Sequence, residues 1–106
     1  MSVDSQDPVP VPEIVWDLRK ARSNLRKHKV SFEEAATALE DPLSTTKPDP
    51  DHSISENRFL TLGLSCRHRL VLVAHTDDSD EIRIISARLP TRSERNAYKD
   101  DNLDQA

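Results

Sequence analysis

Three apolar segments in the second half of the chain, joined by short polar connections, restrict the possible folds more than any other feature. The segments 58–64, 70–74 and 82–88 have the length and the leucine-rich or β-branched composition of strands. Their connections, "SCRH" and "TDDSD", are short and polar. Consecutive strands with such connections pair as hairpins, so we expect an antiparallel meander.

The spacing of apolar residues predicts which face of each strand is buried. Leu60, Leu62 and Leu64 fall on one face of the first strand, whereas 70–74 is apolar throughout, as in a strand buried on both faces. Regular alternation in the third strand directs Ile82, Ile84, Ser86 and Arg88 to one face and Arg83, Ile85 and Ala87 to the other.

The first half of the chain predicts a short strand at 14–16 followed by two helices. Asp17 can cap a helix that ends near His28, with a core stripe at Leu18, Ala21 and Leu25. A capping box over 31–34 opens the second helix, which ends before the proline at position 42, and 47–57 reads as a polar connection.

A second capping box, Thr91 with Glu94, opens a C-terminal helix that we expect to end near Lys99. The predicted fold class is α+β: a small antiparallel sheet with two N-terminal helices and a short C-terminal helix. The expected organisation is a disordered leader over 1–12, one domain over 13–99 and an acidic flexible tail over 100–106.

The formal net charge of -4 is unevenly distributed along the chain. Five acidic residues and no basic residue lie in the two end segments, which leaves 14 acidic and 15 basic residues over 12–99. The body of the protein can therefore present a basic face to an anionic partner.

Other features argue against several classes of protein. A single cysteine, Cys66, excludes an internal disulfide and a cysteine-built zinc site, and the four histidines lack metal-site spacing. No apolar run approaches the roughly 18 residues of a membrane span, and the acidic, proline-rich N-terminus is unlike a signal peptide. We expect a cytoplasmic protein without a metal or cofactor and without a membrane partner.

The segment "RKARSNLRKHK" over 19–29 carries six Lys or Arg residues and no carboxylate. Like charges at helical spacing repel each other, so an anionic partner would explain the pattern, and so would a simple solvated helix face. Phosphates are the natural counter-charge if that partner is nucleic acid, and an acidic segment would serve if it is a protein.

Several residues of the last two strands permit chemistry but do not prove it. Arg88 and Arg83 either reach solvent or point into a cleft, and His75 beside Thr76 is either a surface residue or an acid–base group. Cations, hydroxyls and one histidine suffice for metal-free RNA cleavage, in which the 2′-hydroxyl of the substrate attacks the adjacent phosphate.

The chain resembles the BrnT family of toxins over about 13–99. The resemblance is carried by short stretches in a specific order: Val15-Trp16-Asp17, Lys20, Asn24, Lys27-His28, 30–35, Asp41-Pro42, Arg58-Phe59, Gly63, His75-Thr76, 83–88, Thr91, Glu94-Arg95 and Tyr98. It implies a RelE-like fold and an RNA-cleaving toxin that arrests translation. It also implies a BrnA-like ribbon-helix-helix antitoxin, a heterotetrameric complex, and contact with promoter DNA only through the antitoxin.

We combine the resemblance with the cation pattern to predict the site: the first helix and the last strand should lie side by side and bring their cations into one cleft that binds RNA. Lys27, His75, Arg83 and Arg88 are the expected catalytic residues. The expected RNA-binding residues are Arg19, Lys20, Arg22, Asn24, Arg26, Arg58 and Thr76.

The chain departs from the family pattern at Lys29, at Asp78 and at Leu89-Pro90. The family has glycine at the first of these positions, and cations are common at the others. The losses of cations predict weakened activity, and they motivate an alternative function. In that alternative the chain is a binding partner of the antitoxin that acts mainly in promoter co-regulation.

Overall fold

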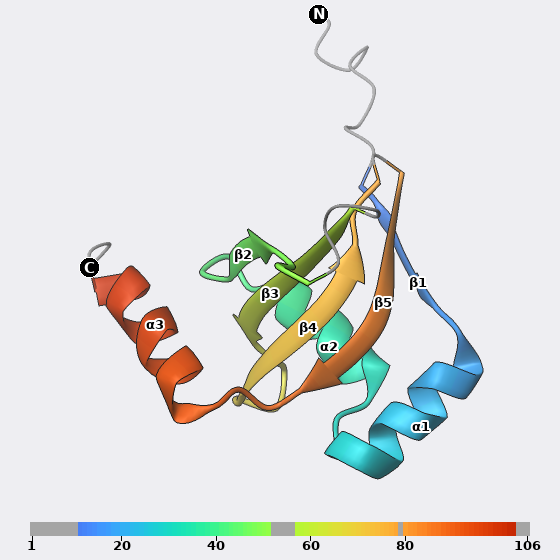
Figure 1. The fold of residues 1–106 in the computed structure, drawn as a ribbon, viewed down its shortest axis with the longest axis horizontal. Coiled ribbons are helices and arrows are strands. Elements are labelled where there is room, and N and C mark those ends of the chain that lie inside the picture. Colours follow the sequence, from blue (N-terminus) through green and yellow to red (C-terminus); the bar gives the residue numbers. More distant parts are fainter. Residues whose placement is uncertain (1–10, 52–56, 79, 104–106) are drawn as a thin grey trace, which may run out of the picture.

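The chain forms five strands and three helices, and the predicted α+β class is confirmed (Figure 1). A computed structural model describes residues 11–51, 57–78 and 80–103, so most of the predicted leader lies outside the described residues. The elements in chain order are β1 (Glu13–Trp16), α1 (Leu18–His28), α2 (Phe32–Leu39), β2 (Thr45–Pro48), β3 (Arg58–Leu64), β4 (Leu70–Thr76), β5 (Glu81–Arg88) and α3 (Arg92–Leu103).

The strands form a single mixed sheet in the order β1-β5-β4-β3-β2. The predicted antiparallel meander of β3, β4 and β5 is confirmed. A wholly antiparallel sheet is wrong, because β1 lies parallel to β5 with Ile14 opposite Ile82. The segment 47–57 was predicted to be a polar connection, but its first two residues are the last two residues of β2. The proline at position 48 is tolerated in this strand because β2 lies at the edge of the sheet.

The hydrophobic core lies between the sheet and α2, and we call this side of the sheet the helix face and the other side the open face. In Figure 1, α2 lies behind the sheet, so the open face is turned toward the reader. Gly63 of β3 lies directly against α2, because a Cβ at this position would collide with the Ala38 carbonyl. The buried core residues are Val30, Phe32, Ala35, Ala38, Val71, Val73, Ile84 and Ala87.

A β-bulge interrupts the pairing of β4 with β5. Ala74 is opposite Ser86 and His75 is opposite Ile84, so Ile85 is an extra residue without a partner in the ladder. As a result Ile84 and Ala87, three residues apart, are both buried in the core on the helix face. The regular alternation predicted for this strand is therefore wrong beyond Ile84.

α1 packs against β5 mainly through an asparagine, and of the predicted apolar stripe Ala21 packs against the core whereas the two leucines do not. Leu18 is 67% exposed and Leu25 is 49% exposed, whereas Asn24 is buried. The Asn24 amide donates to the carbonyl of Ala87 at 2.8 Å and accepts from the N–H of Ala87 at 3.0 Å. It also donates to the Val30 carbonyl at 2.9 Å. The amide thus binds the backbone of β5 as a neighbouring strand would.

The helix ends follow the capping predictions with two differences. Asp17 caps α1, and Lys29 adopts the left-handed conformation with φ 60°. Ser31 accepts the Glu34 N–H at 3.0 Å, but the Glu34 carboxylate does not return to the cap as a full capping box requires. α3 begins with the predicted Thr91–Glu94 box and continues to Leu103, beyond the expected end at Lys99, so the expected acidic tail starts within a helix.

Candidate active site

Four predicted site residues lie on the open face, in two rows across neighbouring strands. Arg58 is opposite Thr76, whose hydroxyl accepts the backbone N–H of Arg83 at 3.3 Å, and these three residues form the first row. The second row contains Arg88, which is opposite Leu72. Thr76 and Leu72 are four residues apart on β4, so the rows are separated by about 13 Å.

The bulge is the reason that both arginines of β5 reach the open face. Arg83 and Arg88 are five residues apart, and a regular strand would direct them to opposite faces. The extra residue, Ile85, restores the same orientation on both sides of the bulge. Since Ile84 and Ala87 are buried on the helix face, their neighbours Arg83 and Arg88 point the other way.

Arg88 forms an ion pair on the open face that is held by two hydrogen bonds. Its two terminal nitrogens donate to the two carboxylate oxygens of Glu94 at 3.0 and 3.1 Å. The same carboxylate accepts the Thr91 N–H at 2.8 Å, which places it at the start of α3. The hydrogen bonds from Arg88 hold the pKa of Glu94 below its ordinary value, so this carboxylate is ionised at neutral pH.

Arg83 lies in a different environment, at the acidic end of the same strand. Its guanidinium donates to Glu81 at 3.1 Å, and both side chains are exposed. The adjoining β4–β5 turn contains Asp77, Asp78 and Asp80. An exposed pair of this kind contributes little to stability, because water and salt screen it.

α1 and β5 form a hollow of about 250 Å³. Lys20 and Lys27 border it from α1, and Ser86 borders it from β5. Ser86 is two residues from Arg88 on the same face, so the hollow adjoins the second row. Its complete lining consists of Lys20, Ser23, Asn24, Lys27, His28, Ile85 and Ser86.

The other cations of α1 lie along a different stripe. Arg22, Arg26 and Lys29 border a second, more open hollow together with Leu25. Arg19 is also exposed. The predicted cleft is therefore realised only in part, because α1 and β5 lie side by side but their cations do not line one common cavity.

Two of the predicted site residues, His75 and Asn24, are buried and make hydrogen bonds inside the protein. The side chain of His75 is on the helix face and only 3% exposed, so it is neither a surface residue nor available to an RNA strand. Its Nδ1 faces the Thr76 carbonyl and its Nε2 faces the Thr61 hydroxyl, and burial lowers its pKa. Both N–H groups of the Asn24 amide donate to backbone carbonyls, so this side chain holds α1 against β5, and its contact with RNA stays a prediction.

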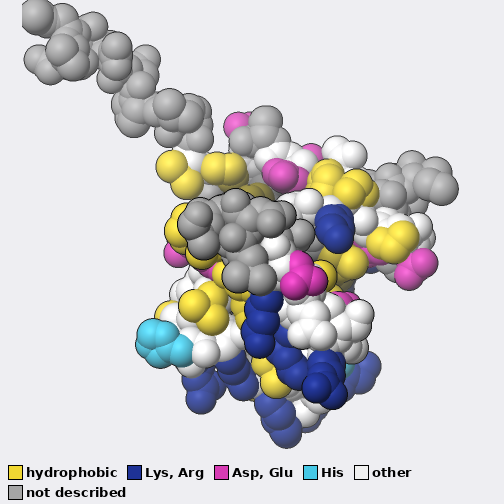
Figure 2. Space-filling view, turned by 90° about the vertical axis from the view of Figure 1, so that its left-hand side faces the viewer, with side chains coloured by type: hydrophobic (Ala, Val, Ile, Leu, Met, Phe, Trp, Pro, Cys, Tyr) yellow, Lys and Arg dark blue, Asp and Glu magenta, His cyan; other side chains and the backbone are white. Residues whose placement is uncertain are grey.

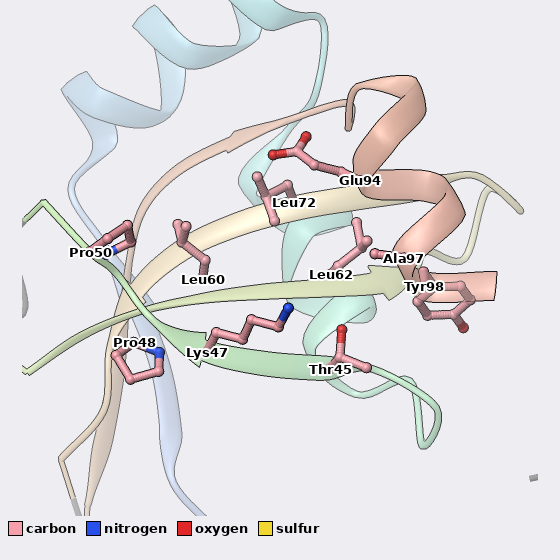
Figure 3. Close-up of a pocket in the computed structure, with 10 residues that line it drawn as sticks. All are labelled: Thr45, Lys47, Pro48, Pro50, Leu60, Leu62, Leu72, Glu94, Ala97 and Tyr98. Carbon is pink, nitrogen blue, oxygen red and sulfur yellow. The ribbon is translucent and has the colours of Figure 1, made fainter. Parts of the chain in front are cut away.

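Sequence reasoning missed a pocket of about 340 Å³ between α3 and the open face. Figure 3 shows Leu60, Leu62 and Leu72 on its floor, with Glu94 at one rim and the Lys47 amine pointing inward. Tyr98 closes the end near α3 and donates to Asp41 at 2.8 Å, and partial burial with this hydrogen bond raises the pKa of Tyr98 to about 12. The alternating leucines of β3 indicated an apolar face of the sheet, but they do not indicate that α3 lies over that face.

Charge is segregated along the molecule. Figure 2 shows Lys and Arg side chains crowded over the lower part, where α1, the β3–β4 turn and the start of α3 lie in Figure 1. The acidic β4–β5 turn lies at the upper end. Within the described ranges, no three His, Cys, Asp or Glu side chains gather as metal ligands would. None of the described helices is long and apolar enough to cross a membrane.

Comparison with known proteins identifies the family. A family profile described as "Ribonuclease toxin, BrnT, of type II toxin-antitoxin system" matches residues 16–94. The crystal structure of the Brucella abortus ribonuclease toxin BrnT is similar in fold, with a TM-score of 0.60, at 20% sequence identity over 77% of this chain and 100% of that chain. No curated protein matches. The matched segment includes both rows of the open face and the Arg88–Glu94 pair, and the chain belongs to the BrnT family of ribonuclease toxins of type II toxin–antitoxin systems.

Proposed function

We propose that the chain is a metal-independent endoribonuclease that binds RNA across the open face, between α1 and α3. One observation carries this proposal: the bulge at Ile85 directs both arginines of β5 to the face that holds Arg58 and Thr76. The lysines of α1 border the same region. RNA presents a phosphate at every nucleotide, so cations at intervals along a strand suit its backbone.

The residues of this face could support cleavage by the 2′-hydroxyl of the substrate. That hydroxyl attacks the adjacent phosphorus, and the bond from phosphorus to the 5′-oxygen of the next nucleotide breaks. Arg88 would stabilise the charge that develops on the phosphorane oxygens, and Lys27 would supply a second cation. Arg83, Arg58 and Lys20 would bind flanking phosphates.

The proposal includes an antitoxin and a cellular effect. A BrnA-like antitoxin with a ribbon-helix-helix part would form a heterotetramer with the toxin and contact promoter DNA. RNA cleavage by the free toxin would block translation in the cytoplasm. The exposed cations of α1 and the apolar pocket under α3 support this idea, since both are surfaces that an acidic and apolar partner segment could cover.

A second candidate function rests on the ion pairs of the two arginines. Arg83 is paired with Glu81, and Arg88 is paired with Glu94. Asp78 adds negative charge near the first pair. If these carboxylates keep RNA away, the chain is a weakened toxin that binds the antitoxin and acts mainly in promoter co-regulation.

The two candidates are separated by assaying the purified chain, free of antitoxin, on RNA in the presence of EDTA. The first predicts cleaved RNA with 2′,3′-cyclic phosphate ends, and growth arrest when the chain is expressed without an antitoxin. The second predicts intact RNA and unimpaired growth under verified expression. Loss of cleavage on chelation alone would contradict the metal independence.

A further inference from the structure

Glu94 lies between the cation of the second row and the apolar pocket. Its carboxylate contacts the Arg88 guanidinium at 3.0 and 3.1 Å. It also lines the pocket whose floor includes Leu72. In Figure 3 the carboxylate stands at the rim of this pocket, above Leu72. The side chain is 33% exposed, so a ligand that enters the pocket can reach it.

The proposed reaction needs a group that removes the proton of the 2′-hydroxyl, and no expected catalytic residue serves this purpose well. His75 is buried on the helix face. Lys27, Arg83 and Arg88 are cations at neutral pH, and a protonated cation accepts no proton. Among the described carboxylates, Glu81 lies beside the first row, about 13 Å away at the acidic end. Asp41 accepts the Tyr98 hydroxyl and is not one of the residues that line the pocket.

We propose that Glu94 is the general base of the cleavage reaction and that the pocket beneath α3 holds the base of the attacking nucleotide. This inference rests on the proposed ribonuclease function. The nucleobase lies on the leucine floor, the ribose lies at the rim and the phosphate lies against Arg88. A carboxylate that touches both the rim and the phosphate-binding cation is within reach of the 2′-hydroxyl in this arrangement.

The 2′-hydroxyl proton passes to Glu94, and the 2′-oxygen forms a bond to phosphorus. The bond from phosphorus to the 5′-oxygen breaks, and that oxygen takes a proton from water. The products are a 2′,3′-cyclic phosphate and a 5′-hydroxyl, after which Glu94 returns its proton to solvent. Arg88 is a fixed donor throughout and remains charged.

Two other roles for Glu94 make opposite predictions. If Glu94 only positions Arg88, its loss weakens RNA binding as much as cleavage. If Glu94 shields Arg88 from RNA, its loss strengthens binding and accelerates cleavage. A general base affects the chemical step and leaves the affinity for RNA unchanged.

The test compares Glu94→Gln with the unaltered chain in single-turnover cleavage and in binding to 2′-O-methyl RNA, which cannot be cleaved. We expect cleavage to slow by about 100-fold or more, as removal of a general base does, with the affinity for the uncleavable RNA within about twofold. The acidic limb of the pH–rate profile should also disappear. Among the described residues, Arg88 on β5 pairs with Glu94, and Lys47 on β2 and Tyr98 on α3 line the same pocket, and all three titratable groups remain in the variant.

Glu33→Gln, an exposed substitution on α2, is the control for removal of a carboxylate and should cleave normally. Thermal unfolding establishes that Glu94→Gln is folded. Equal cleavage by Glu94→Gln, a parallel loss of affinity, or a gain in activity would each overturn the assignment. An unaltered chain that cleaves no RNA overturns the proposed function itself, which is a different result.

A second pair of variants tests the pocket without changing Arg88 or Glu94. Ala97 lines the pocket and Asn96 beside it is exposed on α3 without lining it. Ala97→Phe should fill the pocket and reduce cleavage at low RNA concentration by about tenfold, whereas Asn96→Phe should have little effect. Equal behaviour of the two variants would overturn the placement of the nucleobase.

Discussion

The two ends of the open face contain the same residue type in contrasting surroundings. Arg88 lies at the basic end, beside α1 and the start of α3, and Glu94 holds it with two hydrogen bonds. Arg83 lies at the acidic end, where Glu81 provides one exposed contact and three aspartates lie in the adjoining turn. The comparison teaches that a position on the open face does not by itself make an arginine an RNA-binding residue, because the charge around the arginine decides whether it attracts a polyanion.

The basic end also depends on one buried carboxylate. Glu34 is 3% exposed, and Arg69 donates to both of its oxygens at 2.7 Å. Ser65 donates to it at 2.7 Å, and Arg69 further donates to the Lys29 carbonyl at 2.9 Å. This network joins α2, the β3–β4 turn and the end of α1. The basic end therefore contains its own internal counter-ion.

The largest predicted effect comes from removing that counter-ion. Glu34→Ala should lower the free energy of unfolding by about 3 kcal/mol, because Arg69 and Ser65 lose their partner and a buried space is left. Chemical denaturation measures this loss. Glu81→Ala, which removes the counter-ion of Arg83 at the other end, is the matched control and should cost less than about 0.5 kcal/mol. Equal losses of unfolding free energy in the two variants would mean that the two ends of the open face do not differ in their dependence on a counter-ion.

The next effect concerns activity. Arg88→Ala should reduce kcat/KM for RNA cleavage by about 100-fold, because a charge that stabilises the transition state is lost. Arg83→Ala should reduce it by about threefold at most, since nearby carboxylates already offset its charge. Steady-state kinetics on one RNA substrate provide both numbers. A larger loss for Arg83 would place the reaction at the acidic end.

Acid should weaken the two ends of the sheet at different pH values. Arg69 holds the pKa of Glu34 below its ordinary value of 4.5, so the stability from this ion pair is complete above that pH and is lost as the pH falls through the folded value. His75, whose pKa is lowered by burial, adds a loss that begins near its ordinary value of 6.5. Hydrogen exchange between pH 7 and pH 3 should show amides around His75 at the end of β4 losing protection first, and amides of 65–69 losing protection only below pH 4.5. Glu34→Gln should remove the pH dependence at 65–69 and leave the earlier loss around His75 unchanged.

Reversal of one charge on α1 should have a moderate effect. Lys27→Glu, at the hollow beside Ser86, should weaken RNA binding by about tenfold and lower the slope of log affinity against log salt by about 1 or more. Arg26→Glu makes the same charge change on the other stripe of α1 and should be weaker in effect. Comparable losses would mean that RNA follows the second hollow instead.

The smallest predicted effect is a gain at the acidic end. Asp78→Arg should strengthen RNA binding by about threefold at low salt, since it removes a repulsive charge near Arg83 and adds an attractive one. The gain should disappear at high salt. Glu40→Arg, the same change of charge at the end of α2, is the control. No gain at Asp78 would show that RNA does not extend to the acidic end.

Local patterns in the sequence predicted most of the elements but not the site geometry. Caps, the meander and the order of elements follow from residues such as Asp17 and Thr91, whose effects act within a few positions. The parallel partner of β5 and the orientation of Arg88 depend on contacts between distant segments. One unpaired residue, Ile85, reverses every side chain after it, and no local signal marks that position. The predicted likeness to RelE-like toxins stays a prediction.

Leu25 and Asn24 show the same limit in α1. Apolar spacing predicted that the leucine would be buried, yet the helix meets N–H and C=O groups of β5 that have no strand partner, which an amide satisfies and a leucine cannot. The prediction that α1 lies beside the last strand is confirmed, although only Lys20 and Lys27 of its cations border a hollow with β5. Glu94 was predicted only as a capping residue. Its contact with Arg88 depends on where α3 lies relative to β5, and no local sequence pattern gives that position.

The bond between Asn24 and Ala87 has a consequence for self-association. Beyond the short β1, the edge of β5 would be open to pairing with a strand from another molecule, which is the usual start of aggregation. The asparagine occupies the hydrogen-bonding groups of Ala87 and leaves no template there. At the far edge, β2 is short and ends in a proline that cannot donate to an incoming strand. A toxin produced in excess of its antitoxin would thus be protected against polymerisation through its sheet.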